Sequence, residues 1–325
     1  MIKRNFMIAG LAVLTCALPL SAAQAADYPT KPVKIIVGYP PGGTTDLLAR
    51  LVGVQLQDRL KQPFVIENKP GAGGGIGADA VTKAQPDGYT LGLGTAGNLA
   101  LNYASYAKIS YDSRKDFTAL SLLATMPNVL VVNSKTPAKN YAELIAYLKQ
   151  KEKEGSFFAS TGTGNGPHLT GELFKARTGL NLSHVPYQGA GPAITAVLSG
   201  EVDMLFDNLP SVLPFIQSGK VRAIAVTSAA RVPVLADVPT LQEMGLKDFV
   251  VDAWFALVAP AGLDKGAREK IDKAIAGLSS NEAFKESIRK LGATPELTGG
   301  AELKTLIEQE RERWPALVKQ ANIKF

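Results

Sequence analysis

Cysteine and histidine are nearly absent from this 325-residue sequence, which contains one Cys and two His. Cys16 is the single cysteine and lies in an N-terminal leader, so the mature chain cannot be a disulfide scaffold. With only His168 and His184, a conventional transition-metal site is not expected, and no cofactor is predicted. No segment after the leader approaches the roughly 20 apolar residues that a membrane-spanning helix needs.

Recognisable catalytic and nucleotide-binding motifs are also missing. There is no Gly-x-Ser-x-Gly elbow and no Gly-x-x-x-x-Gly-Lys-Ser/Thr phosphate loop. Gly73–Ala78 matches a dinucleotide fingerprint poorly, because Glu67–Pro70 separates it from the preceding strand. Nucleic acid is not an expected partner despite the net charge of +6, because basic residues are scattered and not interleaved with aromatic ones. The sequence therefore indicates a binding protein and not an enzyme.

The N-terminus has the pattern of a secretory signal peptide. Lys3 and Arg4 precede an apolar stretch from Phe6 to Leu20, and Ala23-Gln24-Ala25 is a small-x-small cleavage pattern. We expect residues 1–25 to be removed after about Ala25 and the mature protein to be exported. The mature chain exceeds the usual size of one domain, so two domains are expected.

Short apolar runs alternate with helical patterns, which predicts an α/β architecture of parallel sheets covered by helices. Strands are predicted at Val33–Gly38, Phe64–Glu67, Thr90–Gly94, Val129–Asn133, Phe157–Ser160, Ser183–Tyr187, Met204–Phe206, Ala223–Thr227 and Trp254–Ala259. Helices are predicted at Thr45–Leu60, Tyr141–Lys151, His168–Thr178, Ala193–Leu198, Leu213–Gln217, Lys265–Leu278, Glu282–Leu291 and Ala301–Gln320.

We predict structural roles, and no ligand contact, for the two tryptophans and for the charged residues of the last helix. Trp254 and Trp314 are expected to be core or domain-packing residues. In the last helix, we expect a solvated face with local ion pairs, formed by Glu308, Glu310, Arg311 and Arg313.

The most informative feature is the junction between the first strand and the first helix, Pro40–Thr45. Gly42 and Gly43 allow a ligand to approach the backbone, and the helix start offers free N–H groups with a favourable dipole. Small polar junctions of the same kind recur at Thr161–Pro167, Gln188–Pro192 and Asp207–Ser211. Ligands of open parallel sheets bind beyond the carboxyl ends of the strands, where these loops lie. Together they predict a crevice that binds a small anion through N–H donors.

Three titratable residues in these loops each have two interpretations. His168 is a potential general base, although we favour a histidine that holds the shape of its loop. Asp46 lies in the first turn of its helix, where capping or loop bracing is favoured over ligand contact. Asp207 ends a strand at the crevice and either braces Asn208 or accepts a hydrogen bond from a ligand hydroxyl or amine.

Beyond these local patterns, the mature sequence resembles the Bug, or TctC-like, family of periplasmic solute receptors of tripartite tricarboxylate transporters. The matching segments include Tyr39–Asp46, Glu67–Gly74, Pro86–Leu91, Val185–Tyr187, Phe206–Ser211, Asp237–Thr240 and Ala259–Gly262.

This resemblance implies a two-domain periplasmic binding fold of type II, a Venus flytrap with two doubly wound sheets joined by a two-strand hinge. One domain would comprise residues 26–125 plus 250–325, and the other residues 126–249. The resemblance also implies a monomer whose partner is the membrane subunits of a tripartite tricarboxylate transporter. A ligand sensor for a membrane signalling receptor, or an exported enzyme acting on a carboxylate ester or amide, remains the alternative.

The resemblance further implies that a small carboxylate binds between the two domains: an amino acid, a di- or tricarboxylate, or an aromatic acid. The sequence does not choose among these ligands. From the first domain the implied ligand-binding residues are Tyr39, Pro41, Gly42, Gly43, Thr44, Asp46, Thr95 and Asn98. From the second domain they are Ser160, Thr163, Asn165, His168, Gly189, Ala190 and Asp207.

Overall fold

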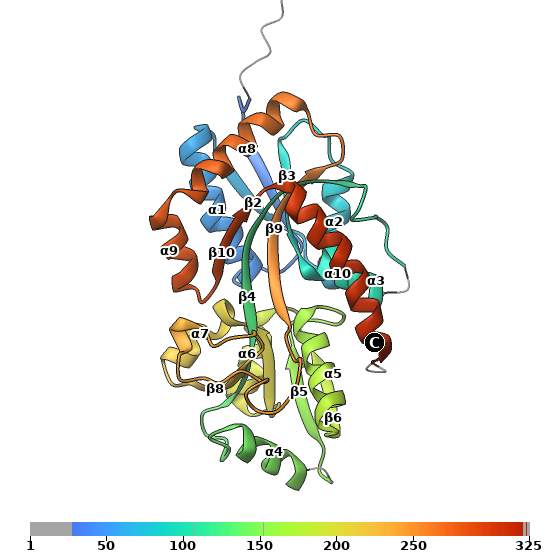
Figure 1. Cartoon of the computed structure of the whole chain (residues 1–325), viewed down its shortest axis with the longest axis vertical. Helices are drawn as coiled ribbons and strands as arrows, with labels where there is room; N and C mark the ends of the chain where they lie inside the picture. The colour runs from blue at the N-terminus through green and yellow to red at the C-terminus, as the bar shows by residue number, and fades with distance from the viewer. Residues whose placement is uncertain (1–27, 107, 152, 321–322, 324–325) are drawn as a thin grey trace, which may run out of the picture.

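The computed structural model describes residues 28–106, 108–151, 153–320 and 323 as two α/β lobes along one long axis (Figure 1). The expected signal peptide and Cys16 lie outside the described residues. The first lobe contains β1 (Val33–Val37), β2 (Phe64–Asn68), β3 (Thr90–Thr95), β9 (Asp252–Pro260) and β10 (Thr294–Thr298). Its helices are α1 (Thr44–Leu60), α2 (Gly75–Thr82), α3 (Asn102–Ser105), α8 (Lys265–Ser279), α9 (Glu282–Lys290) and α10 (Gly300–Gln320).

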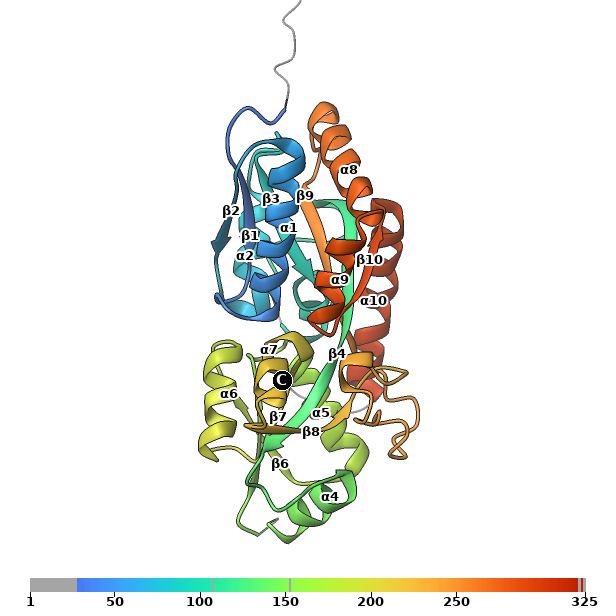
Figure 2. The same cartoon turned by 90° about the vertical axis from the view of Figure 1, so that its left-hand side faces the viewer.

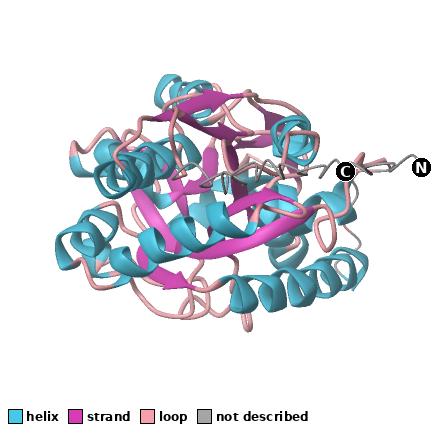
Figure 3. Cartoon of the chain, turned by 90° about the horizontal axis from the view of Figure 1, so that it is seen from above, coloured by secondary structure: helices cyan, strands magenta, loops and turns pink. Residues whose placement is uncertain are grey.

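The second lobe is built from the middle of the chain. Its strands are β5 (Ser156–Ser160), β6 (Leu182–Pro186), β7 (Met204–Asn208) and β8 (Val221–Val226). Its helices are α4 (Tyr141–Gln150), α5 (Gly166–Thr178), α6 (Ala190–Ser199) and α7 (Leu209–Gln217). Seen from above, helices lie on both sides of the strands (Figure 3), as expected for a doubly wound architecture.

One long strand belongs to both lobes. β4 (Phe117–Asn133) is 17 residues long and runs from the first lobe into the second (Figure 2). Its first part pairs with β9 and β10, and its second part pairs with β7 and β8. The strand order β2-β1-β3-β9-β4-β7-β5-β6 is therefore one continuous ladder in the described part of the chain. The predicted two-lobed fold is confirmed, and its two sheets are fused along β4.

Burial explains why the first β-α unit forms as predicted. Val33, Ile35 and Val37 of β1 are fully buried, while Lys34 is exposed. Leu48, Val52 and Leu56 follow a helical period of four on α1 and belong to the same core cluster as β1. Burying each such side chain stabilises the fold by about 1.5–3 kcal/mol. Parallel pairing of β1 with β2 and β3, and of β5 with β6 and β7, matches the prediction.

Three of these helices and strands, α2, α3 and β10, were not predicted. β4 was predicted only in part, because it begins at Phe117, well before the predicted start at Val129. β10 is short and is held by its antiparallel pairing with β4, a contact that its own sequence does not reveal. Within the residues the structure describes, none of the helices is long and apolar enough to span a membrane.

Candidate ligand-binding site

A cleft between the lobes is lined by all four polar strand-to-helix junctions. They follow β1, β5, β6 and β7 and lead into α1, α5, α6 and α7. The first N–H groups of a helix have no partner within the helix, and its dipole adds partial positive charge. The cleft is therefore suited to an anionic group without a cationic side chain. The junction residues that line it are Pro40, Gly43, Thr44, Thr45, Thr161, Asn165, Gly166, Pro167, Gly189, Ala190, Asp207, Asn208 and Ser211.

The residues predicted to bind ligand fall into three groups. Lining the cleft are Tyr39, Gly43, Thr44, Thr95, Asn165, Gly189, Ala190 and Asp207. Thr163 lines an adjoining pocket together with Tyr106, and Pro41 and Gly42 are exposed at their loop. Buried and outside the lining are Asp46, Asn98, Ser160 and His168, each held by hydrogen bonds within its own lobe.

Asp46 braces the first junction. Its carboxylate accepts from Gly42 N at 3.0 Å, from Asn68 Nδ2 at 3.1 Å, and from Arg50 Nε and Nη2 at 2.9 and 3.0 Å. Burial alone would raise the pKa of Asp46, but the hydrogen bonds from Arg50, Gly42 and Asn68 outweigh it and lower the pKa. The geometry agrees with the bracing interpretation of this residue.

The loop after β3 is held by hydrogen bonds on both sides. Thr95 N donates to Asn98 Oδ1 at 2.8 Å, and the Tyr39 hydroxyl lies 2.9 Å from Thr95 Oγ1. On the other side, Tyr111 OH donates to Asn98 O at 2.6 Å.

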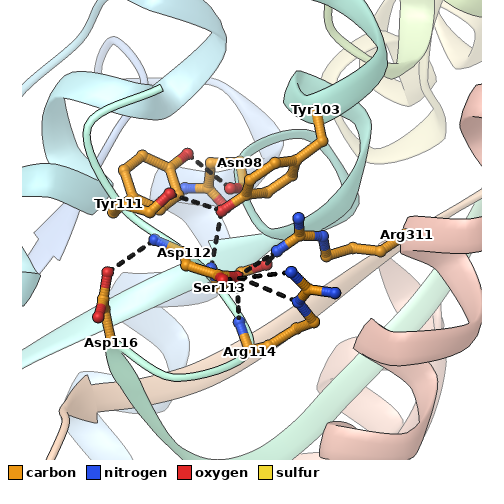
Figure 4. A network of polar contacts seen from close by, with 8 residues as sticks. All are labelled: Asn98, Tyr103, Tyr111, Asp112, Ser113, Arg114, Asp116 and Arg311. Carbon is orange, nitrogen blue, oxygen red and sulfur yellow. Dashed lines mark hydrogen bonds and ion pairs between the residues drawn. The ribbon is translucent and has the colours of Figure 1, made fainter. Parts of the chain in front are cut away.

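A polar network extends from Tyr111 to α10 (Figure 4). Tyr103 OH donates to Tyr111 O at 2.9 Å and accepts from Ser113 N at 2.7 Å. Arg311 of α10 pairs with Asp112 and stacks 3.5 Å from the centre of the Tyr103 ring. The cleft loop that contains Thr95 is thus tied to the C-terminal helix.

The two histidines form a neutral stack in the second lobe. Their ring centres are 3.7 Å apart, and His168 Nδ1 accepts from Gly164 N at 2.9 Å. Burial, and the neighbouring His184, lower the pKa of His168 to about 3. Burial, with a smaller effect of Lys175, lowers the pKa of His184 to about 4. Both rings are therefore uncharged at neutral pH and hold the junction after β5, as the structural interpretation of His168 proposed.

Ser160, at the end of β5, is in hydrogen-bond contact with His184 of β6. Its Oγ is 2.6 Å from His184 Nε2 and also donates to Gly162 O at 3.0 Å. The hydroxyl has a single hydrogen, so which atom donates across the Ser160–His184 contact depends on the tautomer of the imidazole.

Direct contacts close the cleft from opposite lobes. Thr44 Oγ1 lies 2.7 Å from Ser211 Oγ, and Tyr106 OH donates to Thr163 O at 2.8 Å. Gly189 has φ +102°, and a Cβ there would lie 2.9 Å from Cγ of Pro40 in the other lobe. A side chain at position 189 would therefore obstruct this approach. The described conformation is a closed one.

The floor of the cleft contains residues that the sequence analysis assigned elsewhere or did not single out. Asn128, Asp252, Trp254, Phe255 and Trp314 all line it. They come from β4, β9 and α10, which are adjacent in space but distant in sequence. No junction motif marks them, so only the pairing of these elements could have identified them.

Glu310 of α10 corrects the expectation of a solvated charged face. The residue is 6% exposed, and its Oε2 accepts from the indole nitrogens of Trp314 at 2.6 Å and Trp254 at 3.4 Å. Arg313 pairs with Oε1 at 3.0 Å. The expected ion pair exists, but it anchors both tryptophans at the cleft and is not a solvated face.

Known proteins are similar to this chain in sequence and in architecture. The model of the tripartite tricarboxylate transporter family receptor matches residues 48–323. BugT of Bordetella pertussis is 36% identical over 98% of each chain. The structure of R. palustris Rpa4515 with adipate is 35% identical with a TM-score of 0.88, covering 92% of this chain and 99% of that chain. The structure of MatC of Rhodopseudomonas palustris with bound malate is 32% identical with a TM-score of 0.83. It covers 90% of this chain and 100% of that chain.

The two lobes, the shared strand and the cleft between the lobes define a two-domain solute-binding protein of the periplasmic binding fold. Within that class, the chain belongs to the TctC, or Bug, family of receptors, which confirms the resemblance noted in the sequence. The receptors of this family are solute-binding proteins.

Proposed function

We propose that this protein captures a small carboxylate in the cleft between its lobes and delivers it to the membrane subunits of a tripartite tricarboxylate transporter. The observation that supports this most is the convergence of four helix N-termini on one cleft that no Lys or Arg of the described residues lines. Backbone N–H groups at helix starts bind carboxylates without needing a cation. Relatives with bound adipate and bound malate support the same ligand class.

The proposal assigns a role to each lobe. Tyr39, Gly43, Thr44 and Thr95 of the first lobe would hold the carboxylate, with Pro41, Gly42, Asp46 and Asn98 shaping their loops. Asn165, Gly189, Ala190 and Asp207 of the second lobe would read the far end of the ligand, supported by Ser160, Thr163 and His168. A ligand that contacts both lobes favours the closed state, so binding and closure are coupled.

We further propose that residues 26–125 plus 250–325 form one domain and residues 126–249 the other, with β4 and β9 as the two crossing strands. A monomer in the periplasm, released by cleavage after about Ala25, fits the family and the leader sequence. The proposed protein is a receptor and carries out no reaction on its ligand.

Thermal unfolding against a panel of carboxylates and their amides tests carboxylate capture. The protein is first unfolded and refolded so that any co-purified ligand is removed. An acid present at about 100 times its dissociation constant should add about 2.7 kcal/mol to the free energy of unfolding, whereas its amide should not. Equal stabilisation by acid and amide, or none by any acid, would contradict the proposal.

A further inference from the structure

A turn of the second lobe, at residues 162–165, contacts the end of α3 in the first lobe through its backbone carbonyls. Tyr106 OH donates to Thr163 O at 2.8 Å, and Ser105 Oγ donates to Gly164 O at 3.1 Å. Tyr106 and Thr163 line the adjoining pocket and not the cleft itself. These contacts are therefore separate from the hydroxyl contact between the lobes inside the cleft.

The space at Gly164 is limited by the other lobe. A Cβ on Gly164 would lie 2.7 Å from Cε2 of Tyr106 and 2.9 Å from Cβ of Ser105. Apart from its chain neighbours, the three heavy atoms nearest to that position all belong to the first lobe. The φ of +75° favours glycine whether the lobes are open or closed, but the lack of space requires glycine only in the closed state.

The 162–165 turn is braced from within its own lobe. Gly164 N donates to His168 Nδ1 at 2.9 Å, and His168 N donates to Asn165 Oδ1 at 3.1 Å. Asn165 Nδ2 in turn donates to Thr161 Oγ1 at 2.9 Å. The turn is thus preformed before it meets the first lobe, which reduces the conformational entropy lost on closure.

The contacts of this turn with the first lobe are reversible. Ser105 Oγ shares its single hydrogen with Leu101 O, which is also 3.1 Å away and one helical turn earlier, so the hydroxyl keeps a partner when the lobes separate. Tyr106 is partly exposed and Thr163 is exposed, so water can replace their mutual hydrogen bond. Opening on this side therefore leaves neither side-chain hydroxyl buried and unsatisfied.

We propose that the 162–165 turn is a latch that holds the cleft closed, and that His168 positions this latch through Gly164. Asn165 and Thr161 also line the cleft, so a solute that contacts them stabilises the same unit that binds the first lobe. The retention of a solute by the latch rests on the proposed function. The latch itself is a property of the closed conformation and is tested without any solute.

Disulfide trapping in the refolded mature protein measures closure directly. The mature chain has no cysteine, because Cys16 lies in the leader, and the hydroxyl oxygens of Thr44 and Ser211 are 2.7 Å apart. Cysteines at these two positions can form a disulfide only when the lobes are closed. Equilibration with reduced and oxidised glutathione gives the effective concentration of the two thiols, which is proportional to the closed fraction. If this reporter forms no disulfide with the latch intact, the closed conformation and the latch are both overturned.

Two substitutions in this reporter remove latch contacts, and each has a matched control. Gly164→Ala should lower the effective concentration about tenfold, because the added methyl group must displace Tyr106. Gly179→Ala is its control, because Gly179 has a similar φ of +68° but nothing within 4 Å of its Cβ position. Tyr106→Phe should lower the effective concentration about fivefold, as expected for one hydrogen bond. Tyr28→Phe is its control, because Tyr28 OH donates to Gly88 O within the first lobe. Effects no larger than those of the controls would overturn the latch.

His168→Leu and His168→Asn test the positioning role. The first variant lacks an acceptor for Gly164 N, whereas the second offers its amide oxygen in place of Nδ1. His168→Leu should lower the effective concentration about fivefold, and His168→Asn should restore most of it, although both variants remove the stack on His184. Equal effects of the two variants would overturn the positioning role of His168. None of these measurements uses a solute, so a flat carboxylate panel would contradict the proposed function and leave the latch intact.

Discussion

Thr44 and Ser211 join the two lobes across the cleft: their hydroxyl oxygens are 2.7 Å apart, and Thr44 N donates to Ser211 Oγ at 3.1 Å. Thr44 is the first residue of α1, and Ser211 lies in the first turn of α7. The same helix starts that offer N–H groups to an anion are thus in direct contact in the closed state. Closure and ligand binding therefore depend on the same residues.

Ser211→Ala should weaken ligand binding by destabilising the closed state. A hydrogen bond contributes about 1 kcal/mol net, so the dissociation constant should rise roughly fivefold for the acid that gives the largest thermal shift. Calorimetry measures the affinity, and small-angle scattering should show less compaction at a given ligand concentration. Ser218→Ala, an exposed serine after the same helix, is the control. Unchanged affinity in Ser211→Ala would argue against a role of this contact in closure.

Glu310→Ala should destabilise the fold much more than its charge suggests. The substitution leaves the buried indole N–H groups of Trp254 and Trp314 without their common acceptor. We expect a loss of about 2–4 kcal/mol in the free energy of unfolding. Glu310→Gln retains an acceptor oxygen and should lose less than half of that.

Glu308→Ala is the matched control for Glu310, because Glu308 is exposed on the same helix. Denaturant unfolding of the three variants should show a change within about 0.5 kcal/mol for the control. Equal effects of the substitutions at positions 308 and 310 would contradict the anchoring role of the buried carboxylate.

Asp207→Asn should change how stability depends on pH. Burial raises the pKa of Asp207 from 3.8 to about 7, although Asn208 N partly opposes the shift. Between these values the folded protein binds more protons than the unfolded chain, so the contribution of Asp207 to stability falls as pH rises. The variant lacks this titration. Its stability relative to wild type should therefore increase from about pH 4 to about pH 7.5, by on the order of 4 kcal/mol at most.

Thermal unfolding of wild type and Asp207→Asn across this pH range measures the difference. Asp237→Asn, exposed in the same lobe, should keep a constant offset from wild type. A constant offset for Asp207→Asn as well would show that this carboxyl is ionised in the folded protein at acidic pH.

Intrinsic fluorescence should report ligand binding directly, because both tryptophans of the sequence line the cleft. Trp254 is 3% exposed and Trp314 is fully buried, so a ligand that replaces water beside them changes their surroundings. Titration should give the same dissociation constant as calorimetry. Trp254→Phe and Trp314→Phe assign the signal to one ring or both. Calorimetric binding without any change in fluorescence would place the ligand away from the tryptophans.

Local sequence patterns predicted the strands, helices and junctions whose signals are adjacent in the sequence. The strand Val33–Val37 and the helix from Thr44 were predicted to within a residue because the apolar run, the Gly-rich turn and the helical period are adjacent. The junctions after β5, β6 and β7 were predicted for the same reason. Their meeting at one cleft follows from parallel pairing, since the carboxyl ends of parallel strands share an edge.

Where the secondary structure or burial of a residue depends on segments distant in sequence, local patterns could not predict it. The segment before Val129 is a strand because it pairs with β9, which lies 125 to 143 residues later in the sequence, from Pro127 opposite Asp252 to Phe117 opposite Pro260. Glu310 lies in a polar run that is typical of a solvated helix face, and its burial depends on two tryptophans, one of which is on β9. The floor of the cleft likewise arises only when β4, β9 and α10 are assembled.

The continuity of β4 constrains how the cleft opens. Because this strand passes from one lobe to the other within a hydrogen-bonded ladder, and β9 pairs beside it, no flexible linker separates the lobes at this point. Opening must then twist or bend the paired strands, which restricts the lobes to a narrow path instead of a broad set of orientations. Little orientational entropy is lost on closure, so more of the contact energy remains available as affinity.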